Sequence, residues 1–150
     1  MAAADATLVD LDEALADLQG QLNLMFVRAR SLWKESAARI HPELPPAAYK
    51  LLTFIAHAGS TSAHELADRF EMDKSMVSRQ TRMLEELGLL QSRPDERDGR
   101  LRVLTATPVA RDALAAVRRD NAERLRGAIA ELSAEELQAA SKVFRVLSEA

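Results

Sequence analysis

The longest regular pattern in the chain is an apolar stripe in its N-terminal quarter. Apolar side chains recur there at steps of three or four, the spacing of one helix face. They are Leu11, Leu15, Leu18, Leu22, Met25, Ala29, Leu32 and Ile40. A continuous helix over these residues is about 45 Å long at 1.5 Å per residue, more than a compact domain of 150 residues needs for its own core. The pattern therefore predicts a helix that ends before the prolines of residues 42–46 and that a partner subunit covers.

Shorter helices follow, marked by start and stop signals. One is expected from near Ala47 to Gly59, because glycine at positive φ suits a C-terminal cap. Ser62 and Glu65 have the S-x-x-E spacing of a capping box, in which each side chain accepts a hydrogen bond from a free backbone amide. This second helix is therefore expected to start at residue 62, and residues 71–72 are expected to form the turn after it.

The next helix is expected to have two different faces. Asp73 is placed to cap its start and Gly88 to end it. The apolar side is formed by Val77, Leu84 and Leu87, and the opposite side carries Ser75, Ser78, Arg79 and Arg82. A helix of this kind packs on a core with one face and offers the other to a partner.

A hairpin and two further helices complete the chain. Residues 89–93 and 100–105 are expected to be short strands joined by the charged stretch 95–99. Thr107 and Pro108 then supply an N-cap and a proline at the first helical position, for a helix that reaches about residue 130. Ser133 and Glu136 form a second capping box, which opens a last helix running to the C-terminus.

A capped helix, a turn, a helix with a basic polar face and a basic hairpin together have the layout of a winged helix-turn-helix. The second helix of such a unit enters the major groove of DNA, where arginine pairs with guanine, glutamine with adenine, and serine with base edges or phosphates. The hairpin tip, through Arg97 and Arg100, is placed to reach the adjacent minor groove. The expected fold class is mainly α, of the α+β type.

Net charge at first argues against DNA, because the chain carries −3 and phosphate binding relies on a basic surface. The charge is unevenly spread, however. Residues 74–102 hold seven basic and five acidic side chains, and the first twenty residues hold five acids and no base. The acidic total therefore comes from outside residues 74–102, and we expect modest non-specific affinity for DNA, with specific binding dependent on a few arginines.

Several function classes find no support in the sequence. Cysteine is absent, which removes disulfides, thiolate metal ligands and cysteine nucleophiles. His41, His57 and His64 form no i, i+3 or i, i+4 ligand pair, so we expect no metal and no cofactor. The acidic N-terminus does not fit a signal peptide, and no apolar run approaches a membrane span, which places the protein in the cytoplasm. Neither a phosphate-binding glycine loop nor a Ser, His and Asp triad is evident, so an enzyme is not expected.

The wing sequence RPDERDGRLRVLTATP, residues 93–108, matches the DxR…LT signature of the MarR family of winged-helix transcription regulators. The matching residues are Asp95, Arg97, Leu104 and Thr105. The preceding segment, residues 72–90, resembles the recognition helix and first wing strand of that family. The order of elements extends the resemblance over nearly the whole chain, taken as one domain: residues 7–41 and 107–149 as dimerisation helices and residues 46–105 as the DNA-binding lobe.

The resemblance implies a homodimer on the two half-sites of a pseudopalindromic double-stranded operator, with recognition helices about 34 Å apart or a multiple of that. It also implies a repressor released by a small aromatic or phenolic effector. The recognition-helix positions carried over are Ser75, Ser78, Arg79, Gln80 and Arg82. In the wing, Asp95 is implied to brace the hairpin through ion pairing, while Arg97 reaches the minor groove. Phe26, Trp33 and Tyr49 are the candidate lining of the effector pocket, or simple core packing.

Other interpretations stay open at this point. Arg79 and Arg82 are also compatible with a solvated helix face, with an i, i+4 ion pair from Arg82 to Glu86. The whole unit is compatible with a winged-helix adapter that binds protein and no DNA, or with a small helical enzyme. An acidic or apolar face in place of the polar and basic one would favour the adapter, and this sequence does not have such a face.

Overall fold

The computed structural model describes residues 2–150, and their side chains from residue 10 onward. The elements are α1 (Ala2–Ile40), α2 (Pro46–Ala58), α3 (Ala63–Arg69), α4 (Lys74–Glu86), β1 (Leu90–Pro94), β2 (Arg102–Ala106), α5 (Pro108–Ala128) and α6 (Ala134–Glu149). The chain divides into two compact units, Met1–Leu114 and Ala115–Ala150. The mainly helical winged fold expected from the sequence is confirmed.

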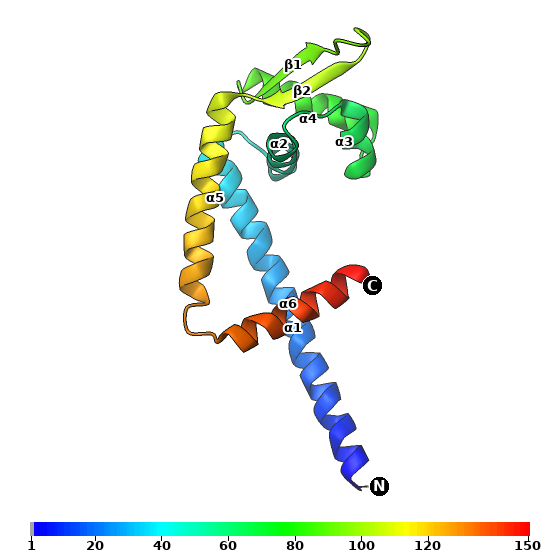
Figure 1. Ribbon diagram of the computed structural model, residues 1–150, viewed down its shortest axis with the longest axis vertical. Coiled ribbons are helices and arrows are strands. Elements are labelled where there is room, and N and C mark those ends of the chain that lie inside the picture. Colours follow the sequence, from blue (N-terminus) through cyan, green and yellow to red (C-terminus); the bar gives the residue numbers. More distant parts are fainter. Residues whose placement is uncertain (1) are drawn as a thin grey trace. The chain divides into compact units, whose positions relative to one another are not determined.

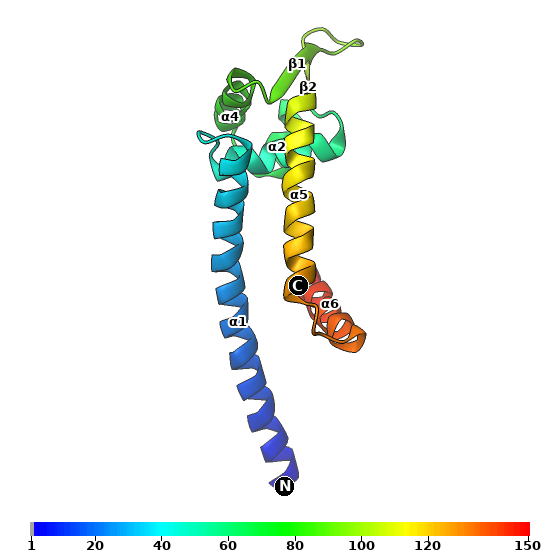
Figure 2. The same cartoon turned by 90° about the vertical axis from the view of Figure 1, so that its left-hand side faces the viewer.

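In the first unit, a small lobe sits at the C-terminal end of the long helix α1. Figures 1 and 2 show α2, α3, α4 and the β1–β2 hairpin gathered there, while the N-terminal part of α1 extends away. The largest fully buried side chains all belong to this lobe: Leu51, Leu52, Ile55, Leu66, Val77 and Leu84. Each lies on a helix at the spacing of one face, so the three short helices share one core.

The helix ends follow the local signals in the sequence. The capping boxes at Ser62 and Ser133 are both formed, and Asp73 Oδ1 accepts a hydrogen bond from the Met76 amide at 2.6 Å. Gly59 and Gly88 follow helix ends at φ +81° and +73°, in the region that favours glycine. Caps are predictable because they depend on residues three or four apart.

The hairpin is antiparallel, with Ser92 opposite Leu104, and differs from the expected bounds. The second strand begins at Arg102 and not at residue 100, because the Leu101 amide donates to the Asp98 carbonyl and closes a turn. The first strand begins one residue late because the Leu89 amide still bonds the Leu84 carbonyl at the end of α4. A further bridge, with both backbone bonds between Thr61 and Leu104, was not expected from the sequence.

The terminal helices are longer or shorter than expected. Helix α1 begins at Ala2, ahead of the apolar stripe, and α5 ends at Ala128, short of residue 130. In the second unit, α6 contains no buried residue, although Phe144 and Leu147 lie on it. Across the part of the chain described, no helix is both long enough and apolar enough to cross a membrane.

Candidate nucleic-acid interface

The helix-turn-helix consists of α3 and α4 joined by a tight turn. The Met72 amide donates to the Ala67 carbonyl, and Glu71 adopts φ +50°, a left-handed conformation that lets the chain reverse. Val77 and Leu84 fix α4 on the core, where they are fully buried. The side of α4 that faces solvent is thereby set by packing and not by its polar residues.

The predicted contact residues on α4 divide into two groups. Ser75, Ser78, Arg79 and Arg82 are all exposed, on the side away from the core. Gln80 is half-buried, and its Oε1 is buried with no hydrogen-bond partner in the part of the chain described. Because pairing with adenine needs both the oxygen and the nitrogen of the amide, Gln80 must turn outward before it reads a base in that way.

Thr81 lies beside Gln80 and has a structural role that the sequence analysis did not assign. Its hydroxyl is buried in the middle of α4 and donates to the Val77 carbonyl at 2.9 Å. The polar face of α4 is therefore narrower than its polar residues suggest. No ion pair links Arg82 with Glu86 within the described residues, so the exposed arginines are not held to the helix surface by that pair.

Backbone hydrogen bonds hold the wing together. Asp95 Oδ1 accepts from the amides of Arg97, at 2.7 Å, and Asp98, at 3.3 Å, while the Asp95 amide donates to the Leu101 carbonyl. The implied bracing role of Asp95 thus rests on amide donors and not on an ion pair. This bonding fixes the turn that carries Arg97 whatever the basic side chains do.

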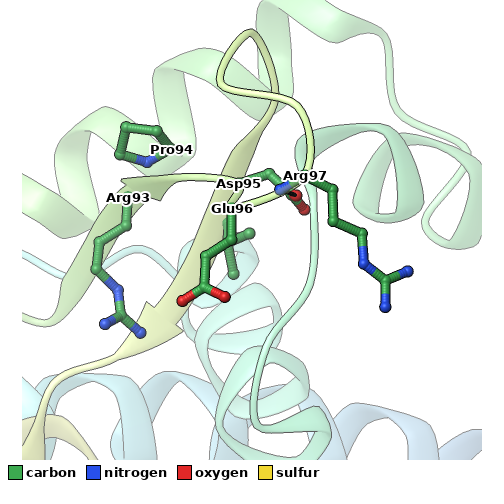
Figure 3. A pocket seen from close by; sticks show the side chains of 6 residues that line it. Arg93, Pro94, Asp95, Glu96 and Arg97 are labelled. Atoms are coloured by element: carbon green, nitrogen blue, oxygen red, sulfur yellow. Dashed lines mark hydrogen bonds between the residues drawn. The ribbon is translucent and has the colours of Figure 1, made fainter.

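The basic side chains of the wing lie apart from one another. Figure 3 shows Arg93 and Arg97 extending from opposite ends of segment 93–97, with Glu96 between them in this view. They line a hollow of about 370 Å³ together with Pro94, Asp95 and Val103. Arg100 is 94% exposed and lies 3.5 Å from Asp98 Oδ1. Within the described part of the chain, Arg97 is therefore the tip arginine without an acidic partner, whereas Arg100 is paired with Asp98.

Arg102 is a wing residue that the sequence analysis did not single out. Its Nε donates to Ser92 Oγ at 2.7 Å and its Nη2 to the Ser92 carbonyl at 2.9 Å. Both bonds cross the hairpin, so this arginine stiffens the two strands against each other. This role of Arg102 could be predicted only from the strand register, and the expected register was wrong because the turn at Asp98 delays the start of β2.

A second hollow lies against Trp33, between α1, α2 and the end of α3. One part, of about 510 Å³, is lined by Arg30, Trp33, Pro46, Ala47, Lys50, Phe70 and Met72, and an adjoining part by Trp33, Lys50, Thr53, Phe54, His57 and Phe70. Lys50 Nζ lies 4.0 Å from the centre of the Trp33 ring. Trp33 lines the hollow as expected, but Phe26 and Tyr49 do not: Phe26 is 58% exposed elsewhere on α1, and Tyr49 packs on the core.

Lys50, Phe54 and Phe70 are the aromatic and basic neighbours of Trp33 that sequence reasoning missed. Phe54 and Phe70 meet edge to face at 5.6 Å, and Arg69 stacks on Phe54 at 4.9 Å. No helical spacing signals these contacts, because they join three different helices. Among the described residues, no group of three His, Cys, Asp or Glu side chains is arranged to hold a metal ion.

Comparison with known proteins identifies the lobe. Residues 44–101, which span α2 to the wing tip, match the model of the MarR family. These residues form a MarR-family domain. The matched segment covers α2, α3, α4 and β1 in full.

Relatives extend the likeness beyond the MarR-family domain. An uncharacterised HTH-type transcriptional regulator of Bacillus subtilis, YxaD, is 27% identical over 125 residues, which are 83% of this chain and 87% of YxaD. A crystal structure of a MarR family transcription regulator matches with a TM-score of 0.81 at 19% identity, over 96% of this chain and 93% of its own. A structure of a mutant MarR from E. coli complexed with operator DNA matches with a TM-score of 0.63 at 18% identity. The match covers 85% of this chain and 91% of the MarR chain. The helices outside the MarR-family domain thus share the fold as well.

Glu65 joins the start of α3 in this domain to the loop that pairs with β2. Its carboxylate accepts hydrogen bonds from the Thr61 hydroxyl and the Ser62 amide, and these bonds lower the pKa of Glu65. Because the folded pKa is lowered, the stabilisation is present above the unfolded pKa and is lost as pH falls through the folded pKa.

We therefore expect Glu65→Ala to lower the melting temperature at pH 7, with the difference from wild type shrinking as pH falls below the usual range of glutamate. Thermal unfolding followed by circular dichroism between pH 7 and pH 3 measures this. The matched control is Glu85→Ala, which removes an exposed carboxylate from α4 and should change the melting temperature far less. A Glu65→Ala deficit that is constant over this range would contradict the assignment.

Proposed function

We propose that this protein is a transcriptional regulator that binds double-stranded DNA as a homodimer, and that it acts as a repressor. The observation that carries the proposal is the exposed polar face of α4, with Ser75, Ser78, Arg79 and Arg82, held beside an arginine-bearing wing in a MarR-family domain. A regulator of transcription acts where the DNA is, so we place it in the cytoplasm. The proposed role is binding and not catalysis.

The dimer is supported by apolar side chains that the single chain leaves in solvent. On α1 and α6 these include Leu11, Leu15, Leu24, Met25, Phe26, Val27, Val143, Phe144, Val146 and Leu147. Large exposed apolar surfaces in a monomer mark sites of association. A two-fold dimer buries the same helix faces on both copies and presents two copies of α4 to two half-sites.

Fluorescence anisotropy of a labelled duplex, titrated with the protein at several salt concentrations, distinguishes a DNA-binding regulator from a winged-helix adapter. The proposed function predicts tight binding to a cognate site that weakens steeply as salt rises, because bound arginines release counterions from phosphates. Absent or salt-insensitive binding would favour a winged-helix adapter that binds protein.

Arg97→Ala tests the proposed role of the wing. We expect weaker binding and a salt dependence whose logarithmic slope is lower by about one, because one fewer phosphate is neutralised. Arg119→Ala, an exposed arginine of α5, is the matched control and should leave the slope unchanged. An unchanged slope in Arg97→Ala would exclude a phosphate or groove contact by this residue.

The hollow at Trp33 is the proposed effector site. Its lining combines aromatic rings with Arg30 and Lys50 and includes no acidic side chain, which suits an aromatic effector that carries a negative charge. An effector reduces DNA binding only by the difference between its affinities for the DNA-competent and the alternative conformation, so a tight but indifferent ligand has no effect.

Trp33 is the single tryptophan of the chain, so its fluorescence reports ligand in this hollow directly. We expect benzoate to quench it, and Lys50→Ala to weaken that binding by about two- to fivefold, the range of an exposed charge pair. Lys34→Ala, on α1 outside the lining, is the control. Equal quenching of the wild-type protein and Lys50→Ala would contradict the assignment of Lys50.

A further inference from the structure

Two large apolar side chains in the lobe are left in solvent. Within the described residues 44–106, they are Met76, 38% exposed, and Leu101, 57% exposed. Met76 lies on α4 and Leu101 on the wing, which are the two elements proposed to meet DNA. The other large apolar side chains of this segment are buried or half-buried, so the exposed ones lie only on the two elements of the proposed binding surface.

Met76 occupies the first turn of α4. Its backbone amide is held by the Asp73 cap at 2.6 Å, which fixes where its side chain leaves the helix. Arg79 follows three residues later, so the two side chains are neighbours on the helix surface. The N-terminal residues of a recognition helix are those that contact base edges in the major groove.

The chemistry of methionine restricts what it can recognise there. Its thioether is at most a weak hydrogen-bond acceptor and has no donor, so it does not read the polar pattern of a base edge. The major groove offers one apolar group, the C5 methyl of thymine. The side chain is unbranched and flexible, which lets it follow the position of that methyl.

We infer that Met76 is a specificity-determining residue that packs on the methyl of a thymine next to the base pair read by Arg79. This inference rests on the proposed function, since it requires α4 to lie in the major groove. It predicts a thymine preference at one fixed position of each half-site. Covering the methyl also removes part of the Met76 side chain from water, which favours the bound state.

The test replaces each thymine in turn by uracil, which removes the methyl and leaves the base pairing unchanged. The probe is a duplex selected by the wild-type protein from random-sequence DNA, and affinity is measured by anisotropy. We expect about a fourfold loss at one thymine per half-site, the effect of uncovering one methyl-sized group. The affinity for the thymine duplex divided by the affinity for the uracil duplex is the thymine-to-uracil ratio. In Met76→Ala this ratio should fall to about one at that position, whereas in Met76→Leu it should stay above one.

Leu101→Ala is the matched control, because it removes the other exposed apolar side chain of the lobe. It should leave the thymine-to-uracil ratio intact whatever it does to the overall affinity. A wild-type protein that binds the selected duplex but ignores every uracil substitution would overturn the inference and leave the proposed function standing. A ratio that survives in a folded Met76→Ala variant would also overturn it. A wild-type protein that selects no DNA would overturn both.

Discussion

Replacing Arg79 by alanine is expected to weaken operator binding by about 1–3 kcal/mol and to relax the base preference at one position of each half-site. Arg79 is exposed on the solvent side of α4, nearly two turns after the Asp73 cap, where a guanidinium can donate two hydrogen bonds to guanine O6 and N7. Because such a bidentate contact exists only with guanine, its loss affects the cognate sequence more than random DNA.

Anisotropy titrations of the operator and of a scrambled duplex, at one salt concentration, measure this difference. The control variant Arg119→Ala removes one positive charge from α5 and should weaken binding to neither duplex appreciably. An equal loss on operator and scrambled DNA in Arg79→Ala would show that the side chain contacts phosphate alone, and the base-reading role would then be wrong.

Replacing Phe144 by aspartate is expected to dissociate the proposed homodimer. Phe144 is 49% exposed on α6, with Leu147 on the same side of the helix. A carboxylate placed in an apolar interface loses its hydration without gaining a partner. Truncating a central aromatic anchor costs at least about 2 kcal/mol, which corresponds to dimerisation weaker by about thirtyfold or more.

Sedimentation equilibrium of Phe144→Asp should therefore show monomer at concentrations where the wild-type protein is a dimer, together with loss of tight binding to a two-half-site operator. Gln138→Asp is the control, because residue 138 is an exposed polar residue of α6 that lies about 120° around the helix axis from residue 144. A Phe144→Asp protein that stays dimeric would contradict the role of this face.

The parts of the fold that depend on near neighbours were predictable from the sequence. Ser62, Asp73, Thr107 and Ser133 each cap a helix as expected, because a cap needs only a side chain and an amide three residues away. The two faces of α4 followed from helical spacing in the same way. The DNA-contact roles of its exposed residues stay predictions.

The parts that depend on distant neighbours were not predictable. The bridge between Thr61 and Leu104 joins residues over forty positions apart, and no local pattern marks it. The hydrogen bond from Arg102 to Ser92 could be predicted only from the correct strand register, and the turn at Asp98 shifts that register from the expected one. The neighbours of Trp33 lie on α2 and at the end of α3, so periodicity along α1 could not indicate them. Trp33 itself was expected only from the resemblance to the MarR family.

Selection of bound duplexes from random-sequence DNA tests the central claim most directly, because it examines partner, symmetry and spacing at once. The account predicts enrichment of a two-fold symmetric site whose half-sites lie about 34 Å apart, one turn of the duplex, or a multiple of that. Each half-site should contain a guanine whose selection is lost in Arg79→Ala. Recovery of unenriched DNA, or of a site without two-fold symmetry, would contradict it.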